Sequence, residues 1–350
     1  MRKSFDSLTE RERRILAALI DHYVKTADPV GSRVLANKYK LGISPATIRN
    51  TLQDLEELGL VTQPHTSAGR VPTDLGYRVY VDLLLKPDLL SVEEQEQIHE
   101  HIASNFTAID QILEQTSRIL AQVSHQLGVS TAPKFDSAVL TKMEMIPVAE
   151  RKLLVVIAVR SGIVKTILME VDSNLSSNMI SETCRLLNEK LVGLTLGEIN
   201  RTVSERFRDV KLGDPKLLRV FTDSMNAITS DMSADGLHVG GTSHMLMHPE
   251  FSNTSNLNQI LGAIEEKRSI ADAVSSLGTH DGVVVTIGKE ANLGNFEMCS
   301  MVTSTYSAGR SKGTVGVIGP TRMQYSKLVS IVDYTAKLLS KLLSESEQER

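Results

Sequence analysis

Cysteine is scarce in this sequence, tryptophan is absent, and no apolar run is long enough to span a membrane. The two cysteines, Cys184 and Cys299, lie far apart in 350 residues, which argues against a disulfide framework. The segment MRKSFDSLTERERR lacks the apolar core of a signal peptide. With 41% hydrophobic and 23% charged residues the composition is that of a globular protein, so we expect a cytoplasmic protein of two or three domains.

Motifs for catalysis, cofactors and metals are missing as well. No GxSxG segment is present, and the glycine-rich run GTVGVIGP at 313–320 matches neither the GxGxxG nor the P-loop pattern. Three histidines, His238, His244 and His248, lack the HExxH spacing and have no cysteine nearby, so polar loop histidines explain them better than a metal site. We therefore expect no enzyme, no cofactor and no metal.

The net charge of −4 is distributed unevenly. Residues 1–85 hold 12 Lys and Arg against 10 Asp and Glu, a net +2, whereas residues 86–350 hold 26 against 32, a net −6. A weakly basic N-terminal part permits local contact with nucleic acid while the acidic remainder keeps the chain soluble. An excess this small is also common on ordinary surfaces, so the charge alone does not decide for DNA.

Helix-start signals divide the first 60 residues into three helices. Thr9 and Glu12 form a capping box that starts a helix ending before the Asp-Pro pair at 28–29. Ser32 is predicted to cap a second, short helix with three inward side chains, Val34, Leu35 and Tyr39. After a turn with a glycine, Ser44 caps the third helix, whose first position is a proline.

The third predicted helix has an apolar and a polar side. At about 100° per residue, three apolar side chains share one line and four others lie opposite: Ile48, Leu52 and Leu55, against Ala46, Arg49, Asn50 and Gln53. A short helix, a turn and a helix with a polar N-terminal face is the helix-turn-helix arrangement, which enters the major groove. There Asn and Gln pair with adenine, Arg pairs with guanine, and Ala approaches a thymine methyl. Ser44 and Thr47 lie where phosphate contact is expected.

A wing is predicted after this helix. Residues 60–63 have strand character, and PHTSAGR at 64–70 is a turn that leads back into a second strand. Arg70, at the expected tip, suits a phosphate or the minor groove, and His65 is a further candidate contact. Thr73 then caps another helix. The alternative, a solvated polar face on an ordinary core helix, accounts for the third helix alone but not for the wing after it.

The remainder of the chain combines β-like runs with helices. Ser91 begins a capping box and a helix to about Leu127, and further helices are expected over 177–192 and 321–343. The strand-like runs are 137–146, 152–159, 163–171, 282–287, 296–302 and 314–318. Helices beside an antiparallel sheet indicate an α+β domain.

Residues 196–281 begin with helix-like segments and separate the strand-like runs on either side, so we expect a domain inserted into the sheet domain. Its Met-rich stretch offers an adaptable apolar contact between subunits, although composition alone favours these side chains as the core of the insert: Met245, Leu246, Met247 and Phe251. The predicted division is a DNA-binding domain at 1–88, a sheet domain in two parts at 89–195 and 282–350, and the insert at 196–281.

Five segments together resemble the HrcA family of heat-inducible transcription repressors. They cover nearly the whole chain in order: 8–35, 44–61, 66–82, 240–251 (GGTSHMLMHPEF) and 315–323 (VGVIGPTRM). The resemblance implies a multidomain α+β fold with an N-terminal winged helix-turn-helix, a GAF-like antiparallel sheet with flanking helices, and an inserted α+β dimerising domain.

The resemblance also implies partners. A homodimer would bind double-stranded DNA at the CIRCE inverted repeat, ahead of the chaperone operons groE and dnaK, with the chaperonin GroEL as the modulating partner. Because GAF-like domains often hold small ligands, a ligand-responsive repressor is the main alternative. A protein that uses its winged helix only to dock other proteins is a third possibility.

Overall fold

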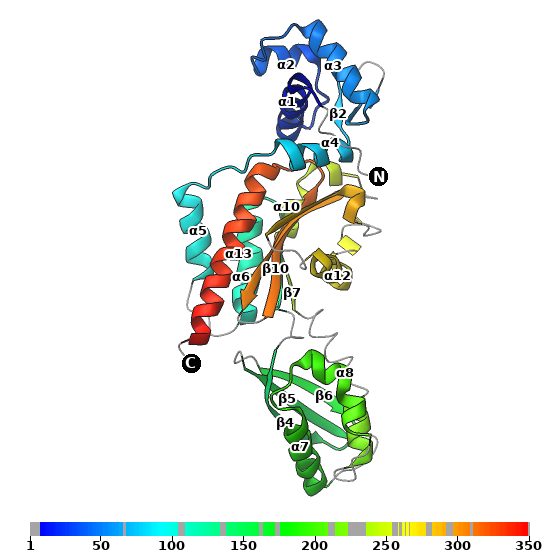
Figure 1. Ribbon diagram of the computed structural model, residues 1–350, viewed down its shortest axis with the longest axis vertical. Helices are drawn as coiled ribbons and strands as arrows, with labels where there is room; N and C mark the ends of the chain where they lie inside the picture. The colour runs from blue at the N-terminus through cyan, green and yellow to red at the C-terminus, as the bar shows by residue number, and fades with distance from the viewer. Residues whose placement is uncertain are drawn as a thin grey trace.

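The protein, described by a computed structural model, is a column of three domains (Figure 1). The structure describes residues 8–348 except 66–67, 104–108, 134–137, 161–163, 172–175, 209–213, 223–235, 254–257, 259–260, 263, 266, 278–281, 292–296 and 309–310. An N-terminal head, residues 8–85, stands on a central sheet domain, and a smaller sheet domain lies at the opposite end. The predicted multidomain α+β architecture with an N-terminal winged helix is confirmed.

The head has the winged-helix order of elements. They are α1 (Glu10–Thr26), α2 (Ser32–Lys38), α3 (Pro45–Glu57), β1 (Val61–Thr62), β2 (Val71–Pro72), α4 (Asp74–Val79) and the π-helix η2 (Tyr80–Leu84). Thr9, Ser44 and Thr73 cap α1, α3 and α4 as predicted, each accepting a hydrogen bond from the backbone N–H three residues on.

The prediction for α2 is wrong in two details. Gly31 rather than Ser32 is the N-cap, and the Val34 side chain is 36% exposed instead of inward. Leu35 is fully buried, and the hydroxyl of the half-buried Tyr39 donates to Asp21. A helix of seven residues makes about two turns, so its apolar periodicity defines the buried face poorly.

The central domain is one antiparallel sheet with helices on both faces. Its strands lie in the order β7-β3-β10-β9-β8: β3 (Leu127–Thr131), β7 (Leu237–Gly240), β8 (Val283–Ile287), β9 (Cys299–Ala308) and β10 (Ser311–Pro320). One face is covered by α6 (Ile109–Ser124) and α13 (Tyr325–Gln348), with α5 (Val92–Ile102) beside them. The other carries α10 (Thr242–Leu246), the 3-10 turn η4 (Pro249–Phe251) and α12 (Lys267–Leu277). A second 3-10 turn, η5 (Gly288–Ala291), follows β8.

The single helix predicted from Ser91 to Leu127 is wrong. The capping box at Ser91 is present, but the chain forms two helices, α5 and α6, that pack on each other. His125 has a positive φ of 55° just after α6, and β3 follows at once. This strand was missed because all five of its residues are buried, which leaves no alternation in the sequence. The predicted start of β9 at 296 lies outside the described residues.

The smaller domain has its own sheet and its own core. Strands β4 (Leu140–Ala149), β5 (Lys152–Val159) and β6 (Val164–Glu170) form an antiparallel meander. Helices α7 (Ser177–Leu191) and α8 (Leu196–Arg206), with a helical segment at 215–222, cover one face and bury a separate apolar cluster. The strands and the helix predicted in this part of the chain are confirmed.

The inserted domain therefore occupies a different range from the one we predicted. It spans residues 138–222, not 196–281, because β3 before it and β7 after it are neighbours in the central sheet, with Gly128 opposite Gly240. Strands β4 to β6 were assigned to the central sheet from the sequence. Period and composition identify a strand but do not say which sheet it joins, and here the partner strands are decided by tertiary packing.

Candidate nucleic-acid interface

Helix α3 presents a polar N-terminal face to solvent. Ile48, Leu52 and Leu55 are at most 4% exposed and hold the helix against the head's core. Four side chains on its outer surface are exposed, as expected: Ala46, Arg49, Asn50 and Gln53. The orientation predicted for the helix is thus correct, and their base contacts remain a prediction.

Two of the candidate phosphate-binding residues also build the start of this helix. The Ser44 hydroxyl oxygen accepts a hydrogen bond from the Thr47 N–H at 3.1 Å and lies 2.9 Å from the Thr47 hydroxyl. The buried Thr51 hydroxyl donates to the Thr47 carbonyl. Ser44 is exposed and Thr47 half-buried, so both remain accessible beside the helix N-terminus, where an anion is favoured.

The turn before α3 is held by backbone geometry and one long side chain. Gly42 has a positive φ of 71°, a conformation that glycine adopts without strain. Arg14 on α1 donates to the carbonyl of Leu41 at 3.4 Å, and the Leu41 side chain is buried. These contacts fix α2 and α3 at their crossing and keep the polar face of α3 turned outward.

The wing lies against the chain between α1 and α2. Val30 and Arg70 exchange both backbone hydrogen bonds, at 2.8 and 3.0 Å. A Cβ on Gly69 would come within 2.4 Å of the Val30 carbonyl carbon, so only glycine fits there. Gln63 donates its side-chain amide to the Ala68 carbonyl and closes the wing. Residues 66–67 lie outside the described residues, and the adjacent His65 is exposed.

Arg70 is not at the tip of the wing, which corrects our expectation. It lies where the wing meets Val30, with its guanidinium 2.8 Å from the carboxylate of Glu56 on α3. Its side chain is 20% exposed. The sequence placed Arg70 in the right loop, but an ion pair between a wing and a helix depends on how the two elements pack.

Packing behind the wing explains another glycine. The Thr73 hydroxyl donates to the Gly59 carbonyl at 2.7 Å while its oxygen caps α4. A Cβ on Gly76 would lie 2.0 Å from the Leu60 carbonyl oxygen. Glycine at 76 therefore lets α4 approach the backbone at the start of the wing.

The proposed apolar contact does not form one surface. Met245 and Phe251 are at most 1% exposed in the core of the central domain, whereas Leu246 is 38% and Met247 80% exposed. A buried side chain cannot meet a second subunit, so Met245 and Phe251 are wrong as interface residues. All four lie outside the small inserted domain, in the central one.

The three histidines do not converge. His238 on β7 lies 3.8 Å from Asp110, whereas His244 and His248 both approach His125, which the sequence did not single out. Burial lowers the pKa of His248. No group of three metal-binding side chains occurs within the part of the chain that the structure describes. The rings of His125, His244 and His248 lie together where the end of α6 meets α10, and His238 is not among them.

Comparison with known proteins decides the family. A model described as the winged helix-turn-helix transcription repressor, HrcA DNA-binding domain, matches residues 7–82, and one described as the HrcA protein C-terminal domain matches residues 110–329. The chain belongs to the HrcA family of heat-inducible transcription repressors. The head is thus the family's DNA-binding domain, and the sheet domains are its C-terminal part.

Relatives match along nearly their full length. The heat-inducible transcription repressor HrcA of Geobacter sulfurreducens is 39% identical over 338 residues, covering 96% of this chain and 98% of that protein. The HrcA proteins of Pelotomaculum thermopropionicum and Chlorobium chlorochromatii are 37% and 38% identical over similar spans, 96% and 97% of this chain and 97% and 99% of theirs.

A solved structure shares the fold. The crystal structure of a hypothetical protein at 2.2 Å resolution has a TM-score of 0.58 at 22% identity, covering 97% of this chain and 100% of that one. Among the described residues, no helix has the length and apolar character needed to cross a bilayer.

Proposed function

We propose that this protein represses chaperone operons by binding an inverted-repeat operator, CIRCE, upstream of groE and dnaK. The observation that carries the proposal is the exposed polar face of α3, where Arg49, Asn50 and Gln53 project beside a wing. These side-chain types pair with guanine and adenine in the major groove. Repression requires only occupancy of the promoter, so we assign no catalytic role and place the protein in the cytoplasm with its operator.

An operator with two-fold symmetry is matched by a protein dimer with two-fold symmetry. We assign the contact between the two subunits to the inserted domain. The outer face of its sheet carries an apolar row, in which Ile146 pairs with Leu154 and Leu154 with Leu168. Ile146 is 42% and Leu168 55% exposed, and Val164 nearby is 56% exposed. An exposed apolar face of this kind on a protein of ordinary composition supports contact with a second subunit. It replaces the interface that we placed at 245–251.

The response to heat is proposed to come from folding stability. Domains are only marginally stable, so a loss of about 1–2 kcal/mol changes the folded fraction several-fold. The chaperonin GroEL would return the chain to its active form, and during stress other clients would occupy it. Repression would then follow the supply of free chaperonin.

Gel-shift titration tests these statements together. The full-length protein should bind a chaperone-promoter inverted repeat more tightly than the same DNA with one half-site mutated. Heating the protein for minutes should abolish binding, and chaperonin with ATP should restore it. Release by a small metabolite at constant temperature, with no effect of heat or chaperonin, would instead establish the ligand-responsive alternative. Equal binding to both DNAs would exclude operator recognition.

A further inference from the structure

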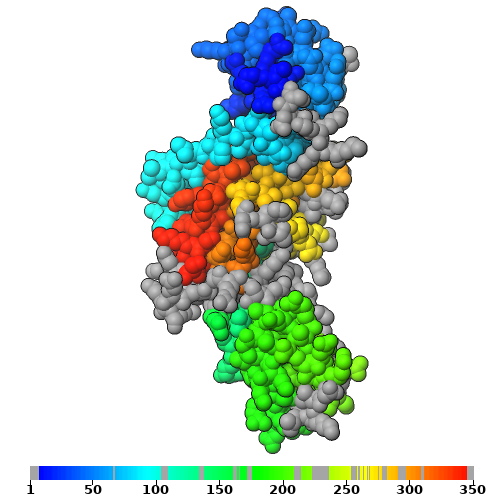
Figure 2. Space-filling model, viewed as in Figure 1, coloured from blue at the N-terminus to red at the C-terminus, as the bar shows by residue number. Residues whose placement is uncertain are grey.

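The head is joined to the central domain by a continuous core. Apolar residues of the head and of α13 belong to one buried cluster, in which the rings of Tyr77 and Tyr325 lie 5.8 Å apart. Helix α4 and the π-helix lie across the end of the sheet, and Figure 2 shows the head seated directly on the central domain. Because the two domains share this core, the orientation of the head relative to the central domain is restricted, unlike that of a winged helix on a flexible tether.

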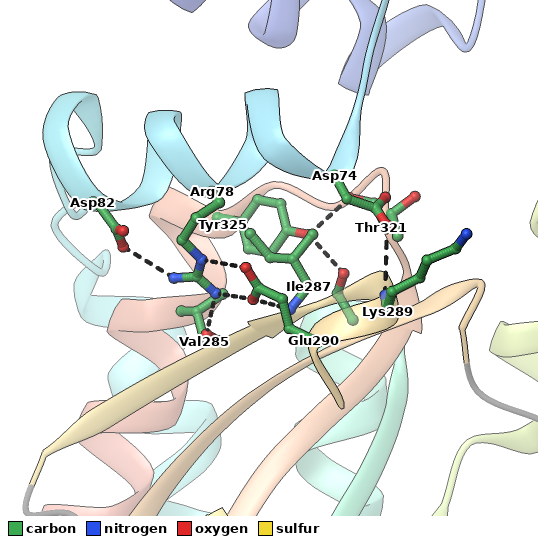
Figure 3. Close-up of polar contacts among 10 residues, drawn as sticks. Asp74, Arg78, Asp82, Val285, Ile287, Lys289, Glu290, Thr321 and Tyr325 are labelled. Carbon is green, nitrogen blue, oxygen red and sulfur yellow. Dashed lines mark hydrogen bonds and ion pairs between the residues drawn. The ribbon is translucent and has the colours of Figure 1, made fainter. Parts of the chain in front are cut away.

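Arg78 on α4 reaches down into the central domain (Figure 3). Its guanidinium holds both carboxylate oxygens of Glu290, with Nε 2.9 Å from Oε1 and Nη2 2.6 Å from Oε2. Nη2 also donates to the carbonyl of Val285 at 2.5 Å, and Asp82 on the π-helix accepts from Nη1 at 2.9 Å. Because β8 is the edge strand, the Val285 carbonyl can serve a partner outside the sheet.

Arg322 makes the reciprocal contact from the central domain. Its Nε and Nη2 hold the carboxylate of Glu250 at 2.6 and 3.2 Å, while Nη1 donates to the carbonyl of Val24 at 2.6 Å. Val24 is in the last turn of α1, where carbonyls have no partner within the helix. The Arg322 side chain is only 12% exposed. Each arginine thus donates to a backbone carbonyl of the other domain while a carboxylate of the central domain orients it.

Two further contacts join the head to the central domain. Asp74 at the start of α4 lies against the turn after β8, where a Cβ on Gly288 would come within 2.4 Å of the Asp74 carboxylate. On the other side, the segment that leaves the head is held to α13, since Asp88 accepts from the Ser326 hydroxyl and, through its carbonyl, from the Ser330 hydroxyl. The connection between domains is therefore fixed at both edges.

We infer that Arg78 and Arg322 are positioning residues that fix the head on the central domain and thereby set the spacing and rotation of operator half-sites. A planar guanidinium that makes two hydrogen bonds to one carboxylate resists rotation, whereas a lysine ammonium that makes a single hydrogen bond does not. The inference rests on the proposed binding of an inverted repeat by a dimer. It also gives a role to Arg78, Glu250 and Arg322, which lie in the segments 66–82, 240–251 and 315–323 and take no part in the proposed DNA contact.

Head orientation is measured first, without DNA. Spin labels are placed at Glu57→Cys on α3 and Lys337→Cys on α13, both exposed, in a Cys184→Ser background. Cys299 is left in place because burial raises the pKa of its thiol to about 12. Labelled chains are diluted with unlabelled protein to remove distances between subunits. Double electron–electron resonance should give one narrow distance distribution for the parent protein, which is the labelled chain with both arginines intact. Arg78→Met or Arg322→Met should broaden this distribution about twofold.

Binding is measured next on three DNAs: a single half-site, the operator, and the operator with two added base pairs, which rotate one half-site by roughly 70°. The parent should prefer the native spacing about tenfold, and the Met variants should retain half-site affinity but lose most of this preference. Arg78→Lys should give an intermediate preference. Arg118→Met is the matched control, because Arg118 forms an exposed ion pair with Glu114 within a single helix, α6 of the central domain.

The outcomes are separable. Narrow distances and an unchanged spacing preference in folded Met variants would overturn the inference. Equal losses on the half-site and on the operator would also overturn it, because they indicate damage to the head itself. If the parent shows no preference for an inverted repeat, the proposed function fails, and the distance measurement still decides whether the arginines fix the head.

Discussion

The guanidinium of Arg70 lies 2.8 Å from the carboxylate of Glu56, so an ion pair joins the wing to the helix proposed to read DNA. Both side chains are partly buried, at 20% and 33% exposure. We expect Arg70 to act by holding the wing in place. Arg70→Met should weaken binding to every DNA sequence, since the wing loses its anchor.

Glu56→Gln distinguishes this role from direct phosphate contact. If Arg70 only anchors the wing, removing its partner should weaken binding about threefold even though a negative charge has been removed near DNA. The neighbouring exposed Glu57→Gln is the control and should strengthen binding slightly. Tighter binding by Glu56→Gln in a gel-shift titration would show that the released Arg70 contacts phosphate.

Asn50→Ala and Gln53→Ala should each reduce discrimination between the operator and a mutated operator by roughly 1–3 kcal/mol, the amount expected for a lost base contact. Both side chains are exposed, so folding should not change. Fluorescence anisotropy with both DNAs measures the difference, with the exposed Gln111→Ala on α6 as a control. A parallel loss on both DNAs would contradict base recognition.

Gly76→Ala should destabilise the head by about 2–3 kcal/mol, because its Cβ would lie 2.0 Å from the Leu60 carbonyl oxygen. Gly31→Ala is the matched control, since nothing lies within 4 Å of a Cβ there. Thermal unfolding followed by circular dichroism should show a markedly lower midpoint for the first variant only. Similar midpoints for the two would mean that α4 shifts to accept the methyl group.

If the protein is the proposed dimer, Leu168→Glu should convert it to a monomer, because the change places a charge in the apolar row on the outer face of the inserted sheet. Leu89→Glu, at a position 97% exposed between the head and α5, should leave the dimer intact. Sedimentation velocity gives the mass directly. A dimer that survives Leu168→Glu and Ile146→Glu would move the interface to another domain.

Glu94 provides a pH test of the contact between α5 and α13. The ammonium of Lys327 holds the pKa of Glu94 below its ordinary value. A depressed pKa in the folded state stabilises the fold above the unfolded value, about 4.3, and this contribution is lost as pH falls through the folded value. Glu94→Gln keeps the capping box, so its melting midpoint should be lower than that of wild type at pH 7 and should converge with it as pH falls through the folded pKa of Glu94. A constant difference across pH would exclude the ion pair as its cause.

Local signals were predicted well for a physical reason. The caps at Thr9, Ser44 and Thr73 are satisfied within three residues, so the sequence contains both partners. The buried and exposed sides of α3 follow from helical period alone, as Ile48 and Asn50 illustrate. The candidate DNA-reading residues could therefore be chosen before any coordinates were known.

The winged helix, most of the strands and helices and, through the motifs, the family were predictable from the sequence. Tertiary structure alone decided which strands share a sheet, and so moved the inserted domain to 138–222. It also paired Arg70 with Glu56, and Arg78 with Glu290, 212 residues away. Period and capping are short-range properties of the chain, whereas strand partners and ion pairs between elements depend on which surfaces the folded core brings together.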